Sequence, residues 1–206
     1  MNHHNLSDAL ERIDEIHHQL AKGETYLGYR PIPVAASGVA GLLAAWLQPK
    51  IIAAGDPQAF VFYWLGTAAI CAFLAAIGVA IHFLRDCDRY ARRRTLHVWG
   101  QLLPCLAAGL LIAFAILRVM PAAVGILPGI WTVLFSLGIF SSRPFLPRAT
   151  GWIALYYLVT GVWLILHPAK LEENLVWPMA IIFCFGQLAG AVMLYYNIER
   201  KLDPHG

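Results

Sequence analysis

The stretch His97–Val119, HVWGQLLPCLAAGLLIAFAILRV, decides the fold of this chain. It contains one charged residue, Arg118, which lies next to its end. About 20 apolar residues in an α-helix are long enough to cross the hydrocarbon core of a bilayer, which is about 30 Å thick. The stretch therefore predicts a transmembrane helix.

The whole chain has the composition of a membrane protein. It has 206 residues, of which 59% are hydrophobic and 13% are charged, and its mean hydropathy is +0.62. Soluble domains carry about 25% charged residues. Five further apolar runs predict spans at Pro33–Ile52, Gln58–Leu84, Ala122–Phe140, Thr150–Leu166 and Leu175–Ile198. These spans are predicted as helices, because backbone amides in lipid need partners within the segment and no stretch alternates like a barrel strand.

The sequence thus predicts an all-α, polytopic integral membrane protein with six transmembrane helices. Its parts are a cytoplasmic amphipathic helix and linker at 1–30, a six-helix bundle at 31–198 and a cytoplasmic tail at 199–206. Of the 15 Lys and Arg residues, only Lys50, Arg118 and Lys170 fall on one side of the predicted bundle. Cytoplasmic loops carry an excess of basic residues, so both termini are expected in the cytoplasm.

The basic stretch Ile81–Trp99, IHFLRDCDRYARRRTLHVW, joins the second and third predicted spans. Its arginines are what the topology requires of a cytoplasmic loop, here taken as Arg85–Arg94. They also suit contacts with anionic lipid headgroups, for which the four candidates are Arg89, Arg92, Arg93 and Arg94. Nucleic acid is not an expected partner, because the loop is short, tethered to the bilayer and without an aromatic stacking platform.

Two histidines border that stretch at a similar expected depth. His82 ends the second span and His97 opens the third, so their imidazoles could ligate a haem iron or, with Cys87 and Asp86 or Asp88, a divalent metal. Their place at the ends of the helices argues against this, because a haem in a bilayer usually takes ligands a turn or more inside. We expect no cofactor, and a haem b or metal site at these histidines is the alternative.

No catalytic residue is predicted. No Asp, Glu or Lys lies well inside a span, and no hydrolase, zinc-protease or Walker motif is present. The embedded polar residues include Gln101 and Gln187, which either bond between helices or line a small polar pocket with Trp131. The chain is therefore expected not to be an enzyme.

Two glycine pairs predict close helix packing. GILPG places Gly125 and Gly129 four residues apart, and GQLAG places Gly186 and Gly190 in the same way. Such pairs let helix backbones approach within one chain or between copies, and a homo-oligomer is expected. Pro128, inside GILPG, predicts a kink or a short re-entrant turn at the start of the fourth span.

The amino-terminal segment LSDALERIDEIHHQLAKG predicts an amphipathic helix. Its apolar seam contains Leu6, Ile13, Ile16 and Leu20, while acidic residues lie on the opposite face. Such a short helix gains stability by packing on a partner. Three partners remain open: the arginine-rich inner loop, a second copy, and another protein at the cytoplasmic face.

Three segments carry a resemblance over nearly the whole chain: GYRPIPVAASGVAGLLAA, GILPGIWTVLFSLGIFSSRPFLPRATGWIALYYLVTG and WPMAIIFCFGQLAGAVMLYYN. Their hydrophobic and glycine-proline pattern resembles a family of small, uncharacterised six-helix bacterial inner-membrane proteins with no established activity. The resemblance implies a bacterial inner membrane as the location and supplies no functional residues. Members are similar to products often encoded beside a winged-helix DNA-binding regulator, which implies a regulated membrane response.

Three functions follow as hypotheses. The leading one is a non-enzymatic sensor, adaptor or assembly factor that engages partners through its cytoplasmic helix and loops. The second is a transporter or channel for a small solute or lipophilic molecule. The third is a haem- or quinone-linked electron carrier that uses His82 and His97.

Overall fold

The computed structural model describes residues 31–85, 89–143, 146, 149–168 and 177–196; for 31, 74–75, 78–85 and 89–99 it describes the backbone alone. Within these residues the chain forms six α-helices and one short 3-10 helix, with no strand. The helices are α2 (Pro31–Ile51), α3 (Pro57–Arg85), α4 (Arg89–Val119), η1 (Pro121–Ile126), α5 (Leu127–Ser142), α6 (Thr150–Leu166) and α7 (Trp177–Leu194). The predicted all-α class is confirmed.

The helices are apolar enough for a membrane. Among the residues whose side chains the structure describes, four segments are long and apolar enough to span a bilayer, namely Ile32–Ile51, Gly100–Val119, Pro121–Ser142 and Trp177–Leu194. Thr150–Leu166 is a shorter apolar helix, and Pro57–Phe73 is an apolar part of the longer helix α3. Large hydrophobic side chains cover the outside, and Trp152, at 74% exposed, and Leu111, at 68%, are examples. This apolar exterior is compatible with a membrane protein, while the count of six spans stays a prediction.

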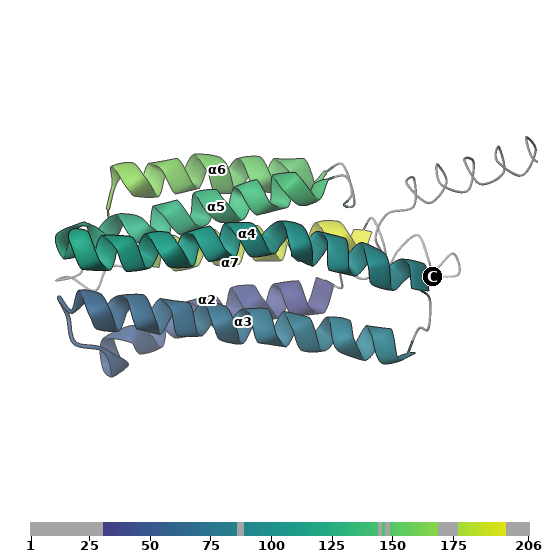
Figure 1. The fold of residues 1–206 in the computed structure, drawn as a ribbon, viewed down its shortest axis with the longest axis horizontal. Helices are drawn as coiled ribbons and strands as arrows, with labels where there is room; N and C mark the ends of the chain where they lie inside the picture. Colours follow the sequence, from purple (N-terminus) through teal and green to yellow (C-terminus); the bar gives the residue numbers. More distant parts are fainter. Residues whose placement is uncertain (1–30, 86–88, 144–145, 147–148, 169–176, 197–206) are drawn as a thin grey trace, which may run out of the picture.

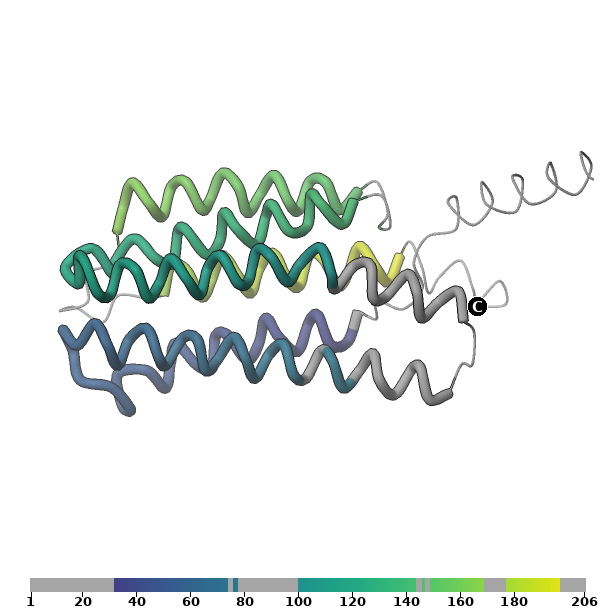
Figure 2. The backbone as a smooth tube through the Cα atoms, viewed as in Figure 1, coloured from purple at the N-terminus to yellow at the C-terminus, as the bar shows by residue number. Residues whose placement is uncertain are grey.

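The six α-helices form a closed ring. Each packs against its neighbour along the chain, and α2 packs extensively against α7, which joins the two ends of the sequence (Figure 1). Successive helices run in opposite directions, as the tube shows (Figure 2). This up-and-down order follows from connections too short to return a helix to the same end of the bundle.

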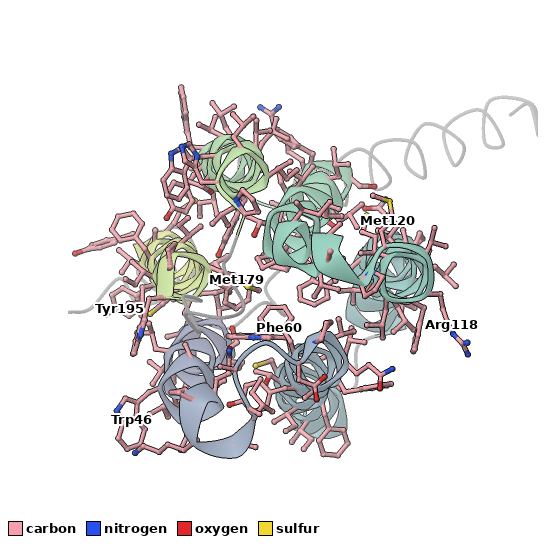
Figure 3. The ribbon with its side chains drawn as sticks, turned by 90° about the vertical axis from the view of Figure 1, so that its left-hand side faces the viewer. Trp46, Phe60, Arg118, Met120, Met179 and Tyr195 are labelled. Carbon is pink, nitrogen blue, oxygen red and sulfur yellow. The ribbon has the colours of Figure 1, made fainter. Side chains whose placement is uncertain are left out.

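One end of the ring is tightly packed, and we call it the closed end. It contains the α2–α3 connection and η1, and lies on the left of Figure 1. The view along the bundle from this end shows Phe60 and Met179 pointing into the ring, whereas Trp46 and Arg118 point outward (Figure 3). The buried residues of its core are Ala44, Ala45, Phe60, Val61, Trp64, Ala113, Val124, Leu127 and Ala180.

The α2–α3 connection shows why α3 begins where it does. Gly55 has a φ of 82°, a left-handed conformation that favours glycine. The Asp56 carboxylate accepts hydrogen bonds from the backbone N–H groups of Gln58, at 2.9 Å, and Ala59, at 3.1 Å. Pro57 then occupies the first helical position, where its missing N–H costs nothing.

Helix α2 continues through Gln48 and Pro49, which fall near the end of the first predicted span, Pro33–Ile52. The Gln48 side chain is 1% exposed, and its Oε1 accepts a hydrogen bond from Trp64 Nε1 at 2.9 Å. Nearby, the Tyr63 hydroxyl donates to the Ala44 carbonyl at 2.6 Å. A polar side chain is tolerated here because α3 supplies its partner.

The arginine-rich loop is shorter than predicted. Helix α3 ends at Arg85 and α4 begins at Arg89, so Arg89, Arg92, Arg93 and Arg94 all lie on helical backbone. The expected loop over Arg85–Arg94 is therefore wrong. Arginine and alanine favour helices, so positive charge at a membrane surface does not by itself end one.

GILPG spans the end of the 3-10 helix and the first turn of α5, and the kink or re-entrant turn expected there stays a prediction. The 3-10 helix Pro121–Ile126 precedes α5, and Pro128 falls in the first turn of α5. Proline is tolerated there because the first amides of a helix have no partner within it.

Candidate functional site

The opposite end of the ring contains a cavity, and we call it the cavity end. The cavity has a volume of about 60 Å³ and lies among α2, α4, α5, α6 and α7. Its lining residues are Val34, Leu102, Phe135, Ile139, Ser142, Leu146, Thr150, Ile153, Tyr157, Gly186, Gln187, Gly190 and Leu194. These described lining residues include no Asp, Glu, Lys, Arg or His. The cavity is therefore an apolar recess with a few neutral polar groups.

Gln187 is the most polar of the lining residues. Its side chain is only 7% exposed, and among the described residues its amide has no hydrogen-bond partner. Gln187 precedes Leu194, the end of α7, by seven residues, which places it about 10 Å from that end. The recess is therefore lined by an amide with unused donors and acceptors, carried by a residue that is mostly buried.

Glycine on α2 lets Gln187 fit between the helices. A Cβ added at Gly38 would lie 2.9 Å from the Gln187 Cβ and 3.3 Å from the Cys184 carbonyl oxygen. Real Cβ atoms hardly ever approach as closely as the first distance. Gly38 thus allows the extensive α2–α7 contact at the depth of the amide.

Tyr157 forms the wall beside Gln187. It is 1% exposed, its hydroxyl donates to the Phe183 carbonyl at 3.0 Å, and its ring meets Phe135 edge-on at 5.2 Å between centroids. A Cβ at Gly186 would collide with the Tyr157 ring and hydroxyl. Tyr157 therefore lies against the α7 backbone because residue 186 is glycine.

A hydroxyl lies nearer the mouth of the recess. Ser142, the last residue of α5, donates to the Gly138 carbonyl at 2.9 Å. Its hydrogen is used, but its oxygen can still accept a hydrogen bond. Gln187 and Ser142 together offer donors and acceptors at two depths.

The other two residues of the predicted pocket lie elsewhere. Neither Gln101 nor Trp131 lines the cavity. Trp131 Nε1 donates to the Gly109 carbonyl at 3.2 Å and so links α5 to α4. The Oε1 atom of Gln101 is buried and has no partner within the described part of the chain. The structure therefore places only Gln187 of the three at the recess.

The predicted glycine positions pack within this chain. Gly129 of α5 faces α6, where a Cβ would lie 2.8 Å from the Gly161 carbonyl oxygen. Gly125 is buried in η1, and Gly190 has neighbours at ordinary distances of 3.6 and 3.7 Å. The sequence analysis missed Gly161 because no glycine lies four residues from it in α6.

Tyr157 and Ser142 were also missed. Tyr157 lies in the middle of a predicted span, away from the interfacial positions that tyrosine favours. The signal that could have singled out Tyr157 was its hydroxyl in the middle of a span. Ser142 gave none, because it lay beyond the predicted end of its span at Phe140.

Several predicted sites lie outside the described residues or side chains. His82 and His97 lie on the backbones of α3 and α4, and their side chains are not described. The partner seam of Leu6, Ile13, Ile16 and Leu20 lies in residues 1–30, outside the described part. Across the residues that are described, no three His, Cys, Asp or Glu side chains gather in a way that could hold a metal ion. A haem or metal at the two histidines stays a prediction.

Comparisons with known proteins give no relative for this chain: no family model matches it, and no match is found among curated proteins or solved structures. The function therefore has to be argued from the site itself.

Proposed function

We propose that this chain is a non-enzymatic sensor or adaptor of the bacterial inner membrane, which it crosses six times with both termini in the cytoplasm. The observation that carries the proposal is the difference between the two ends of the ring. The closed end is filled by buried side chains, whereas the cavity end contains a recess lined by the unpaired amide of Gln187.

A recess closed at one end suits a receptor better than a conduit. Val61, Ala113, Val124 and Leu127 are all 0% exposed and belong to the core of the closed end. A path across the membrane would have to pass between these side chains. Interiors packed at crystal-like density leave no such path without a rearrangement of the helices.

The topology gives the recess a direction. In the proposed orientation the cavity end is cytoplasmic, because α2, α4 and α6 begin there and the basic segments lie there. The recess then faces the same compartment as the amino-terminal segment. A ligand in the recess and a partner on that segment would meet on one side of the membrane, which suits a sensor or adaptor.

The proposed partners follow from the same topology. Arg89, Arg92, Arg93 and Arg94 would contact anionic headgroups of the inner leaflet. The seam of Leu6, Ile13, Ile16 and Leu20 would bind a protein partner or a second copy. Deleting residues 1–23 should abolish such binding without changing the fold of the bundle.

The proposal is tested by cysteine labelling from each side of the membrane. All four native cysteines are replaced by alanine, and Ile139→Cys or Ala113→Cys is introduced singly. Ile139 lines the recess, and Ala113 lies in the core of the closed end. A membrane-impermeant maleimide is then added to spheroplasts or to inside-out vesicles, and the labelled fraction is measured by mass.

We expect Ile139→Cys to react only in inside-out vesicles and Ala113→Cys to react in neither preparation. Reaction of either cysteine in spheroplasts would show that the closed end opens to the outside. That result would replace the sensor with a transporter that uses the same recess.

A further inference from the structure

Gln187 is an unexplained polar group in a protein interior. Polar groups in protein interiors are nearly always hydrogen-bonded to protein or to ordered water. Gln187 as a residue is 7% exposed, and its amide has no hydrogen-bond partner among the described residues. Its polar atoms are not among the fully enclosed ones, so the amide keeps contact with the space of the recess. It lines a cavity large enough to hold a partner.

Water alone fits the recess poorly. A volume of 60 Å³ has room for roughly four to six waters, and each buried water needs two to four polar partners. Most of the wall is apolar, with Val34, Phe135 and Ile153 among its members. The polar side chains of the described lining are one amide and three hydroxyls, at Gln187, Ser142, Thr150 and Tyr157. These four groups are too few to give each of so many waters two to four partners.

An ionic ligand fits poorly as well. The described lining offers no charged side chain, and burying an unpaired charge is far more costly than burying an amide. A neutral ligand that both donates and accepts would match the primary amide of Gln187, and a short alkyl part would cover the apolar wall.

From these properties we infer that the recess binds a small, uncharged solute of roughly five non-hydrogen atoms that carries an amide or hydroxyl group. Its polar group bonds to Gln187, and its alkyl part lies along Phe135 and Ile153. This inference rests on the proposed function, because it names the ligand class that the sensor would detect from the cytoplasm.

Protection of the recess cysteine tests the ligand class. The full-length, otherwise cysteine-free Ile139→Cys chain is placed in nanodiscs and treated with maleimide in the presence of propionamide. The charged comparator is propionate, which has nearly the same size. With a Kd of about 5 mM, reasonable for so small a ligand, about 50 mM propionamide slows labelling roughly tenfold.

Two glutamine variants make the test specific. Gln187→Leu should abolish protection by propionamide, whereas Gln101→Leu, the same change at a half-buried glutamine outside the recess, should retain it. Gln187→Met is a second variant in case leucine disturbs folding, which is checked by circular dichroism. Propionate should protect none of these chains.

Three results would overturn the inference: no protection by propionamide in the chain with native Gln187, equal protection by propionate, or protection that survives in both Gln187 variants. The first of these would assign the recess to water. The two labelling experiments distinguish an error in the ligand class from an error in the proposed function. Labelling from the cytoplasmic side alone, without protection, rejects the ligand class and leaves the one-sided recess, whereas labelling from both sides rejects the sensor whatever propionamide does.

Discussion

Gly186→Ala and Gly190→Ala form a matched pair of perturbations in α7. Both glycines belong to the same sequence motif, and both are buried. A Cβ at Gly186 would collide with the ring and hydroxyl of Tyr157, whereas a Cβ at Gly190 meets Ile153 at 3.6 Å and Val34 at 3.7 Å, which are ordinary contacts. The two substitutions should therefore have opposite effects on stability.

The size of each effect follows from three contributions. Alanine gains about 0.8–1 kcal/mol over glycine in a helix interior. At residue 186 this gain is opposed by overpacking, which costs about 1–3 kcal/mol, and by loss of the Tyr157–Phe183 hydrogen bond, which costs about 0.5–1.5 kcal/mol. Gly186→Ala should thus destabilise the bundle by roughly 2 kcal/mol, while Gly190→Ala should leave it unchanged or stabilise it by up to about 1 kcal/mol.

Equilibrium unfolding in mixed micelles, followed by tryptophan fluorescence, measures both free energies. The chain has seven tryptophans, which supply the signal. A third variant, Tyr157→Leu, removes the hydroxyl and ring that the added methyl group would meet, so in its presence Gly186→Ala should cost less. Equal free energies for the two alanine variants, or a cost at residue 186 that Tyr157→Leu leaves unchanged, would refute the packing described here.

Three further predictions use the same unfolding measurement. Gln101→Leu should be neutral or stabilising by about 1 kcal/mol, because it removes an unpaired buried oxygen. Gln48→Leu should cost about 1–3 kcal/mol, because it leaves Trp64 Nε1 without its acceptor. Similar changes in stability for the two variants would contradict the unpaired state of Gln101 and the hydrogen bond of Gln48. Gly129→Ala should destabilise the bundle by about 3 kcal/mol, because its Cβ would lie 2.7 Å from an α6 backbone nitrogen that no rotamer change can move. An alanine tolerated at this position would show that α5 and α6 are farther apart. Asp56→Ala should cost about 1 kcal/mol through loss of the helix cap, whereas Asp56→Asn should cost little, and equal losses would point to charge rather than capping.

Much of the fold could be predicted because the hydropathy of a segment depends only on its own residues. A run such as Gly100–Val119 is apolar whatever surrounds it, so its helical state needs no tertiary information. One boundary failed where it depended on propensity. The charge of Arg89–Arg94 predicts part of a loop, although its residues favour a helix.

The recess was only partly predictable, because its members come from five helices. The sequence singled out Gln101, Trp131 and Gln187 as polar or amphipathic residues within spans, but no pattern in one helix says which way its neighbours turn. Trp131 bonds to α4 instead, and Gln101 lies outside the lining. Only the packing of the helices in the ring shows which of these three residues lines the recess.

Packing at Gly186 and the shape of the recess are consequences of the same contact. Tyr157 is a large side chain that could fill the middle of the cavity end, as Phe60 and Trp64 do at the closed end. It does not, because Gly186 lets its ring lie against α7 and the Phe183 carbonyl holds its hydroxyl there. Tyr157 and Gln187 both line the volume of the recess. A substitution that displaces Tyr157 should therefore reduce ligand protection and stability together, whereas Gln187→Leu should reduce protection alone.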